Sequence, residues 1–82
     1  MAFLFTSLPV AAKHIHRKIL GETIRLYRKK NQMSQEKLAE QAELHHNYVG
    51  EIERGEKAAT IDTLVKIAKA LQIHLRDLVD EL

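Results

Sequence analysis

Residues 34–55 read SQEKLAEQAELHHNYVGEIERG, and this stretch decides the fold of the 82-residue chain. Its pattern predicts two short helices. Ser34 can cap the first helix, because its hydroxyl can accept a hydrogen bond from a free amide of the first turn. Glu36 suits the positive end of the same helix. Gly55 can end the second helix, because it readily adopts the left-handed conformation required there.

The apolar residues of this stretch fall on one face of each predicted helix. They are Leu38, Ala39 and Ala42 in the first helix and Leu44, Val49 and Ile52 in the second. Helices this short are unstable alone in water, so each must pack against the other and against the rest of the chain. Two such helices joined by a tight turn form a helix-turn-helix, whose second helix fits the major groove of DNA.

The composition favours a single all-α domain. A chain of 82 residues is long enough for one hydrophobic core. Its hydrophobic content is 45% but its aromatic content only 5%, and no alternating run of Val, Thr or Tyr predicts a strand. The net charge of +2 is a weak indication of nucleic-acid binding. The absence of cysteine excludes disulfides and thiolate chemistry and fits a reducing cytoplasm.

Upstream, residues 13–31 (KHIHRKILGETIRLYRKKN) show the periodicity of a helix. Leu20, Ile24 and Tyr27 share its apolar face. Gly21 disfavours the helix by about 1 kcal/mol relative to Ala, so we expect the well-formed part to begin near residue 18. The basic face is either an ordinary solvated surface or lies along a phosphate backbone; it comprises Arg17, Lys18, Arg25, Arg28, Lys29 and Lys30.

Two further helices are predicted downstream. Thr60 can cap the first, with Asp62 in its first turn. Residues 72–74 form a turn, and residues 75–82 form the last helix. The sequence therefore predicts a compact fold of five helices. The apolar residues of the two downstream helices are Ile61, Leu64, Ile67, Ala68, Leu71, Leu75, Leu78, Val79 and Leu82.

Residues 1–12 (MAFLFTSLPVAA) are apolar and uncharged. They have no basic segment ahead of them, unlike a signal peptide, and they are too few to span a bilayer. We therefore expect no membrane association and assign residues 1–16 to an apolar N-terminal extension and residues 17–82 to the helix-turn-helix domain. The extension is a loosely packed tail, or it covers part of the core or a partner through Phe3, Leu4, Phe5 and Leu8.

The segments SQEKLAEQA, YVGEIERG and TIDTLVKIAKAL resemble the DNA-binding domain of the phage repressor and Cro family, also called the xenobiotic-response-element type. The resemblance covers about residues 20–78. LHHNYVGEIERG is most similar to the controller proteins of bacterial restriction–modification systems, which are small dimeric regulators. The resemblance implies a cytoplasmic transcriptional regulator that binds a palindromic double-stranded DNA operator as a dimer, with residues 46–54 in the major groove.

The resemblance also implies roles for individual residues. Arg28 and Glu53 match a partly buried ion pair that links the first and third helices of the family. The residues expected to reach base edges are His45, His46, Asn47, Tyr48 and Glu51. The residues expected to contact phosphates are Gln35, Lys29, Lys30, Arg54 and Lys57.

The chemistry of the predicted recognition helix agrees with these roles. Asn47 can pair with adenine, Glu51 can accept from cytosine, and His46 can donate to guanine. Gly50 is unfavourable inside a helix and therefore indicates close approach to another group. The sequence departs from the family at the turn, where Glu43 replaces a common glycine. If Glu43 is left-handed, its conformation costs about 1 kcal/mol.

A dimer is expected because one recognition helix reads too few bases to select a site. Related repressors bind two half-sites about 34 Å apart. The C-terminal apolar stripe is the candidate interface, and its alternative role is the core of the chain itself. The stripe comprises Leu71, Leu75, Leu78, Val79 and Leu82.

Enzymatic function is not expected, since the sequence has no cysteine nucleophile, glycine-rich phosphate loop or His-Glu-x-x-His motif. The pairs His14–His16 and His45–His46 lack the spacing of metal ligands, so we expect neither metal nor cofactor. The main alternative is a protein-interaction module, such as an antitoxin whose apolar N-terminal segment binds a toxin. RNA polymerase is the other protein partner to consider.

Overall fold

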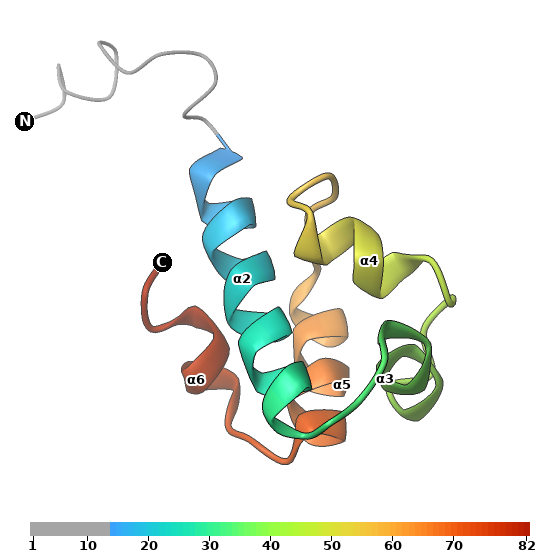
Figure 1. Cartoon of the computed structure of the whole chain (residues 1–82). Helices are drawn as coiled ribbons and strands as arrows, with labels where there is room; N and C mark the ends of the chain where they lie inside the picture. The colour runs from blue at the N-terminus through green and yellow to red at the C-terminus, as the bar shows by residue number, and fades with distance from the viewer. Residues whose placement is uncertain (1–13) are drawn as a thin grey trace, which may run out of the picture.

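The computed structural model describes residues 14–82, so the expectations for Phe3, Leu4, Phe5 and Leu8 lie outside the described residues. The described part of the chain consists of α-helices without strands, which confirms the predicted all-α fold (Figure 1). The helices are α2 (Ile15–Lys30), α3 (Gln35–Gln41), α4 (Tyr48–Glu53), α5 (Ile61–Leu71) and α6 (Leu75–Val79).

The helix ends follow the local signals in the sequence. The Ser34 hydroxyl accepts a hydrogen bond from the Lys37 N–H at 3.0 Å, and this caps α3. Thr60 caps α5 in the same way, accepting from the Thr63 N–H at 3.1 Å. Gly55 follows α4 with φ 74°, in the left-handed region. These three predictions are confirmed.

Three helix boundaries differ from the expected ones. α2 begins at Ile15 rather than near residue 18, so the last two residues of the expected extension are helical. α4 begins at Tyr48 rather than at His46, because the preceding residues form a turn in which the His45 carbonyl accepts from the Tyr48 N–H at 3.0 Å. α6 ends at Val79 rather than at residue 82.

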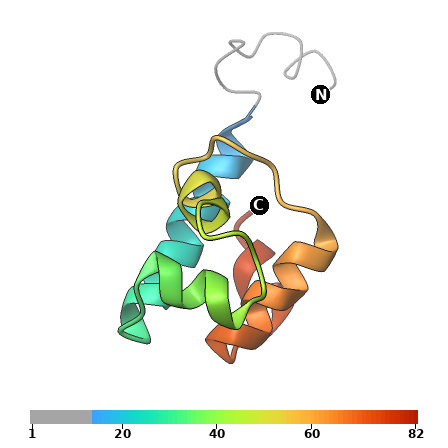
Figure 2. The same ribbon diagram turned by 90° about the vertical axis from the view of Figure 1, so that its right-hand side faces the viewer.

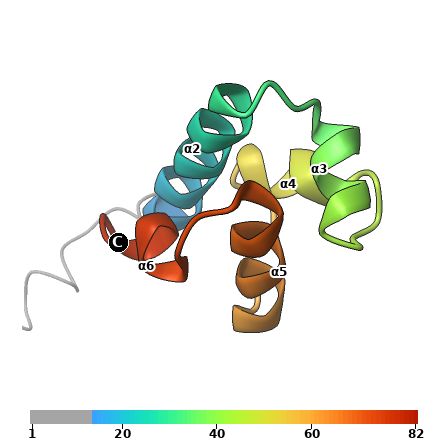
Figure 3. The same cartoon turned by 90° about the horizontal axis from the view of Figure 1, so that it is seen from below.

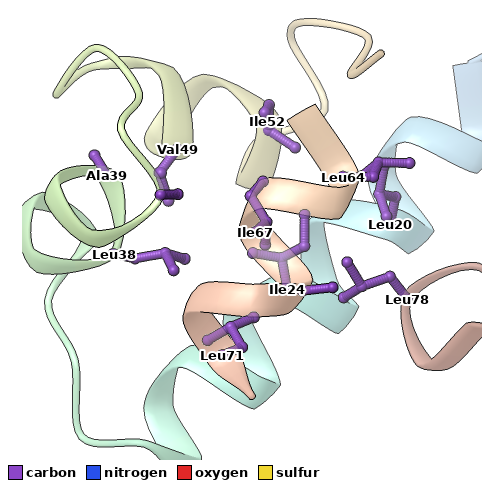
Figure 4. Close-up of a cluster of buried hydrophobic side chains, with 12 residues drawn as sticks. Leu20, Ile24, Leu38, Ala39, Val49, Ile52, Leu64, Ile67, Leu71 and Leu78 are labelled. Carbon is purple, nitrogen blue, oxygen red and sulfur yellow. The ribbon is translucent and has the colours of Figure 1, made fainter. Parts of the chain in front are cut away.

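The hydrophobic core receives side chains from all five helices (Figure 4). Ile24 of α2 and Ile67 of α5 are completely buried within it. The other large side chains with almost no exposure are Leu38, Val49, Ile52, Leu71 and Leu78. The core therefore joins the two short helices of the motif to the longer helices on which they depend.

The helices of the motif lie together on one side of the molecule. In Figures 1 and 3, α3 and α4 occupy the side of α2 and α5 opposite to α6. Figure 2 views the chain from that side, with α3 and α4 nearest the reader. The outer surface of α4 is therefore not covered by another helix of the described part. Within residues 14–82, no helix is both long and apolar enough to cross a membrane.

Gly21 allows α2 and α4 to cross at very short distance. A methyl group at Gly21 would overlap the carbonyl oxygens of Ile52 and Glu53, and it would lie 2.7 Å from the Glu53 carbonyl carbon. Real side-chain carbons do not approach backbone atoms this closely. The expectation that Gly21 shortens α2 was wrong, because the tertiary contact with α4 outweighs its weak intrinsic propensity.

We expect Gly21→Ala to lower the free energy of unfolding by about 1–3 kcal/mol, because the backbones of α2 and α4 must move apart. Denaturant unfolding monitored by circular dichroism would measure this change. Gly50→Ala is the matched control. A methyl group at Gly50 meets only the flexible ends of Arg54 and Gln35, so stability should be unchanged or rise by up to about 1 kcal/mol. Equal stability of Gly21→Ala and the unmodified protein would contradict the close crossing.

Candidate nucleic-acid interface

The carboxylate of Glu53 joins three parts of the chain. Arg28 of α2 donates to it twice, from Nε to Oε2 at 2.6 Å and from Nη2 to Oε1 at 3.0 Å. Gln35, the first residue of α3, also donates from Nε2 to Oε1 at 3.0 Å. The Glu53 side chain is only 3% exposed. Because a buried carboxylate must be paired, these contacts define where the end of α4 lies.

Arg28 has a second role at the entrance to the motif. Its Nη1 donates to the Met33 carbonyl at 2.8 Å, just before α3 begins. One guanidinium therefore holds α4 and also the loop that leads from α2 into α3.

The turn between α3 and α4 contains a strained residue. Glu43 has φ 58°, the left-handed conformation considered from the sequence. The Leu44 N–H closes the turn by donating to the Ala39 carbonyl at 2.8 Å. The conformation of Glu43 costs about 1 kcal/mol relative to a glycine, and the surrounding packing must offset this cost.

The outer surface of α4 contains a hollow of about 280 Å³ at its N-terminal end. The hollow brings together three of the side chains expected to contact bases with two of those expected to contact phosphates. The first three are His46, Asn47 and Glu51, and the other two are Gln35 and Arg54. Glu36 and Gly50 complete its lining.

His45 and Tyr48 do not line this hollow. The His45 ring stacks on the His46 ring with centroids 4.4 Å apart, and its Nδ1 accepts from the Asn47 N–H at 3.2 Å. The Tyr48 hydroxyl donates to the Ala58 carbonyl at 3.3 Å, and its ring packs against the core. Both side chains therefore support the start of α4 and the loop after it.

Gly50 is approached by side chains of the chain itself. A methyl group there would lie 3.0 Å from Nη1 of Arg54 and 3.1 Å from Oε1 of Gln35. The sequence indicated close approach at Gly50 without identifying the neighbour. In the structure, the absence of a side chain at Gly50 makes room for these two polar groups.

The expected phosphate-binding residues divide between two regions. Lys29 lines a second hollow, of about 370 Å³, beside the first, together with Gln35 and Arg54. Arg25, Arg28 and Glu53 also line it. Lys30 lies elsewhere, with its Nζ 5.6 Å from the centroid of the Tyr27 ring.

The two cations that follow α4 are paired with acids of the same chain. Arg54 donates from Nε to Oε2 of Glu56 at 2.7 Å and from Nη2 to Oε1 at 3.1 Å. Nζ of Lys57 lies 3.4 Å from Oε1 of Glu51. Hydrogen bonding to Glu56 raises the pKa of Arg54, and hydrogen bonding from Arg54 lowers the pKa of Glu56. Glu56 was not among the predicted site residues, although its position two residues after Arg54 was a visible signal.

Acidic side chains gather on the opposite side of the molecule. A hollow of about 420 Å³ between α2 and the α6 region is lined by Glu22, Asp77, Asp80 and Glu81. The side chains of Ile19, Thr23, Leu26 and Tyr27 complete it. Since carboxylates repel phosphate, this charge distribution favours an approach of DNA from the α3–α4 side.

The C-terminal apolar stripe is divided by the fold. Leu71 and Leu78 are each only 1% exposed and belong to the core of the chain itself, so they are not available to a partner. Leu75 and Val79 are partly buried against that core. Leu82 is 53% exposed. Of the stripe, only Leu75, Val79 and Leu82 present surface that a second copy of the chain could contact.

A metal site is not formed by the described residues. Between residues 14 and 82, no three His, Asp or Glu side chains gather in a way that could hold a metal ion. The His14 and His16 rings lie edge to face with centroids 6.3 Å apart.

Comparison with known proteins identifies clear relatives. Residues 24–78 match the family described as helix-turn-helix. The chain is 49% identical to control protein C.SmaI of Serratia marcescens over 55 residues, which are 67% of this chain and 66% of that protein. It is 43% identical to control protein C.BamHI of Bacillus amyloliquefaciens over 65 residues, which are 78% of this chain and 80% of that protein.

A solved structure shares both fold and sequence with this chain. The crystal structure of the restriction–modification controller protein C.AhdI from Aeromonas hydrophila superposes with a TM-score of 0.75 at 35% identity. The match covers 76% of this chain and 94% of that chain.

We expect Arg28→Met to lower the free energy of unfolding by about 3–5 kcal/mol, because it leaves the buried carboxylate of Glu53 without its cation. Thermal melts would measure the loss. Arg28→Met combined with Glu53→Gln should be less destabilised than Arg28→Met alone, since no buried charge is left unpaired. Lys37→Met is the exposed control, because the Lys37–Glu40 pair lies at the surface and its loss should cost less than about 1 kcal/mol. A change below 1 kcal/mol in Arg28→Met would contradict the role of the pair.

Proposed function

We infer that the chain, which belongs to the helix-turn-helix family and is a DNA-binding transcriptional regulator, binds a palindromic operator as a homodimer. In this proposal each subunit inserts the N-terminal part of α4 into the major groove. Regulators of this family act by binding DNA, and they act in the compartment that holds the DNA.

The observation that supports this binding mode best is the polar hollow on the outer surface of α4. Its lining includes an amide, an imidazole and a carboxylate, from Asn47, His46 and Glu51. These groups can recognise adenine, guanine and cytosine respectively in the major groove. His45 and Tyr48 would act closer to the edge of the contact, since they support the turn and the loop beside α4.

Phosphate contacts would lie on both sides of this hollow. We propose that Gln35 and Lys29 bind one strand, because both line the second hollow beside α4. Lys57 would contact a phosphate after leaving Glu51, its present partner. Lys30 would reach the backbone only after leaving the Tyr27 ring.

A dimer would supply what one subunit lacks. The net charge of +2 implies few phosphate contacts per subunit and therefore weak binding to DNA of arbitrary sequence. Two subunits on two half-sites would double both the phosphate contacts and the bases read. Leu75, Val79 and Leu82 are the candidate contact surface, because the rest of the stripe lies in the core.

The regulated genes are proposed from the relatives. Two similar proteins are named control proteins, and the solved structure is that of a restriction–modification controller protein. We propose that this chain likewise controls the genes of a restriction–modification system. Nothing in residues 14–82 favours a toxin or RNA polymerase as a partner, so neither partner is proposed.

Selection from random duplexes tests the proposed function directly. The protein should enrich a palindromic motif whose half-sites are about one helical turn apart. Light scattering coupled to size-exclusion chromatography should give the mass of a dimer. A protein that enriches no motif, or that is monomeric at high micromolar concentration and on its DNA, would contradict the proposal.

The base-reading role of Asn47 gives a second test. We expect Asn47→Ala to weaken binding to the selected site by about 1–3 kcal/mol and to leave binding to random DNA nearly unchanged. The Asn47 side chain makes no capping hydrogen bond to α4, so a loss of affinity would not come from a weaker helix. Lys29→Ala should instead weaken both by similar factors. Titrations at fixed salt would measure both variants, and equal losses for Asn47→Ala on the two DNAs would refute base reading.

A further inference from the structure

The side chain of Arg54 runs back over the outer surface of α4. Arg54 follows the last residue of α4, yet its Nη1 lies 3.0 Å from where a methyl group on Gly50 would be. Gly50 is only the third residue of the helix. The direction agrees with the general tilt of helical side chains toward the N-terminus. The guanidinium therefore lies in the hollow that His46, Asn47 and Glu51 also line.

Glu56 holds one edge of this guanidinium and leaves another free. Its carboxylate accepts from Nε and from Nη2 of Arg54. A guanidinium has five N–H groups, so the two on Nη1 and the second one on Nη2 stay available. These groups form the end of the side chain. The free end can donate two parallel hydrogen bonds to one planar acceptor pair.

We propose that Arg54 reads a guanine in each half-site and that Glu56 is the positioning residue that orients it. This assignment rests on the proposed function and changes the role of Arg54 from a phosphate contact to a base contact. Guanine presents N7 and O6 side by side in the major groove, which is the acceptor pair that a guanidinium fork matches best.

Arg54 lines both hollows, and two observations favour guanine over phosphate as its acceptor. The guanidinium shares its hollow with the polar side chains of the first part of α4, the region that enters the groove in helix-turn-helix proteins. In addition, Glu56 pairs with the guanidinium and offsets part of its charge. A paired cation gains less from a phosphate, whereas a bidentate match to guanine depends on geometry and is retained.

Gly50 is part of the same arrangement. A methyl group on Gly50 would lie 3.0 Å from Nη1 of Arg54 and 3.1 Å from Oε1 of Gln35, so both side-chain ends would have to shift by a few tenths of an ångström. Gly50→Ala would move the guanidinium away from the surface of α4 while the helix itself gains a better helix former. This variant therefore tests the placement of the guanidinium, and its stability measured alongside shows whether the contact of Gln35 with Glu53 is kept.

The test is selection from random duplexes with the unmodified protein, Arg54→Ala, Arg54→Lys and Gly50→Ala. We expect one guanine per half-site to disappear from the motif in Arg54→Ala and Arg54→Lys, with discrimination at that position falling roughly 5- to 150-fold. In Gly50→Ala the preference for this guanine should fall by a smaller factor, because the fork is kept but displaced. Arg54→Lys retains the positive charge but loses the planar fork, so it should lose the guanine while keeping its affinity for random DNA. Lys29→Ala is the control and should select the unchanged motif with lower affinity.

Glu56→Gln tests the positioning role. We expect weaker preference for the same guanine together with tighter binding to random DNA. The released cation should also make the slope of log affinity against log salt steeper by up to about 0.9 per subunit. A structural role for Glu56 would not combine a looser motif with a steeper salt dependence.

Some outcomes would overturn the assignment. If Arg54→Ala or Arg54→Lys selects the complete motif with uniformly lower affinity, Arg54 is a phosphate contact. If Glu56→Gln sharpens the guanine preference, Glu56 does not position Arg54. If the unmodified protein selects no motif, the proposed function itself fails and this assignment fails with it. The first two results leave the proposed function intact.

Discussion

The burial of the Glu53 carboxylate is the constraint on which the placement of α4 depends. A buried charge without a partner is strongly unfavourable, so α4 must lie where Arg28 and Gln35 can both reach Glu53. The pair does not have to stabilise the fold strongly to have this effect. It is sufficient that a shift of α4 that keeps Glu53 buried would leave its carboxylate without these partners. Arg28 extends the same constraint to the start of the motif through the Met33 carbonyl.

A steric contact adds a second point of attachment. Gly21 brings α2 against the carbonyls at the end of α4, and no side chain larger than hydrogen fits there. Together, the ion pair and the close crossing define the distance between α2 and α4 and the direction of α4. The short helix is therefore presented with its polar surface outward, although six residues could not form a stable helix alone. The proposed binding surface is thus formed by contacts within the chain itself.

The distribution of charge suggests how this surface balances affinity and selectivity. The cations after α4 are paired with acids of the same chain, and a group of carboxylates lies on the opposite side beside α6. We therefore expect these two cations to add little general attraction to phosphate, so that groups with fixed geometry supply most of the discrimination. This balance suits a small regulator that must find one site among many similar ones.

Local chemistry within the sequence was sufficient to predict the helices and most of their ends. Ser34, Thr60 and Gly55 act through neighbours a few residues away, so their roles as caps and stop were visible without the fold. The pairing of Arg28 with Glu53 was suggested by resemblance to a family rather than by spacing. Only the tertiary structure revealed why Gly21 is required, because its neighbours lie more than thirty positions away in the sequence. The tertiary structure also showed which residues of the C-terminal stripe lie in the core and which lie at the surface, and that the Arg54 side chain extends back over Gly50. These features depend on how separate helices approach one another, and periodicity within one helix carries no information about that distance.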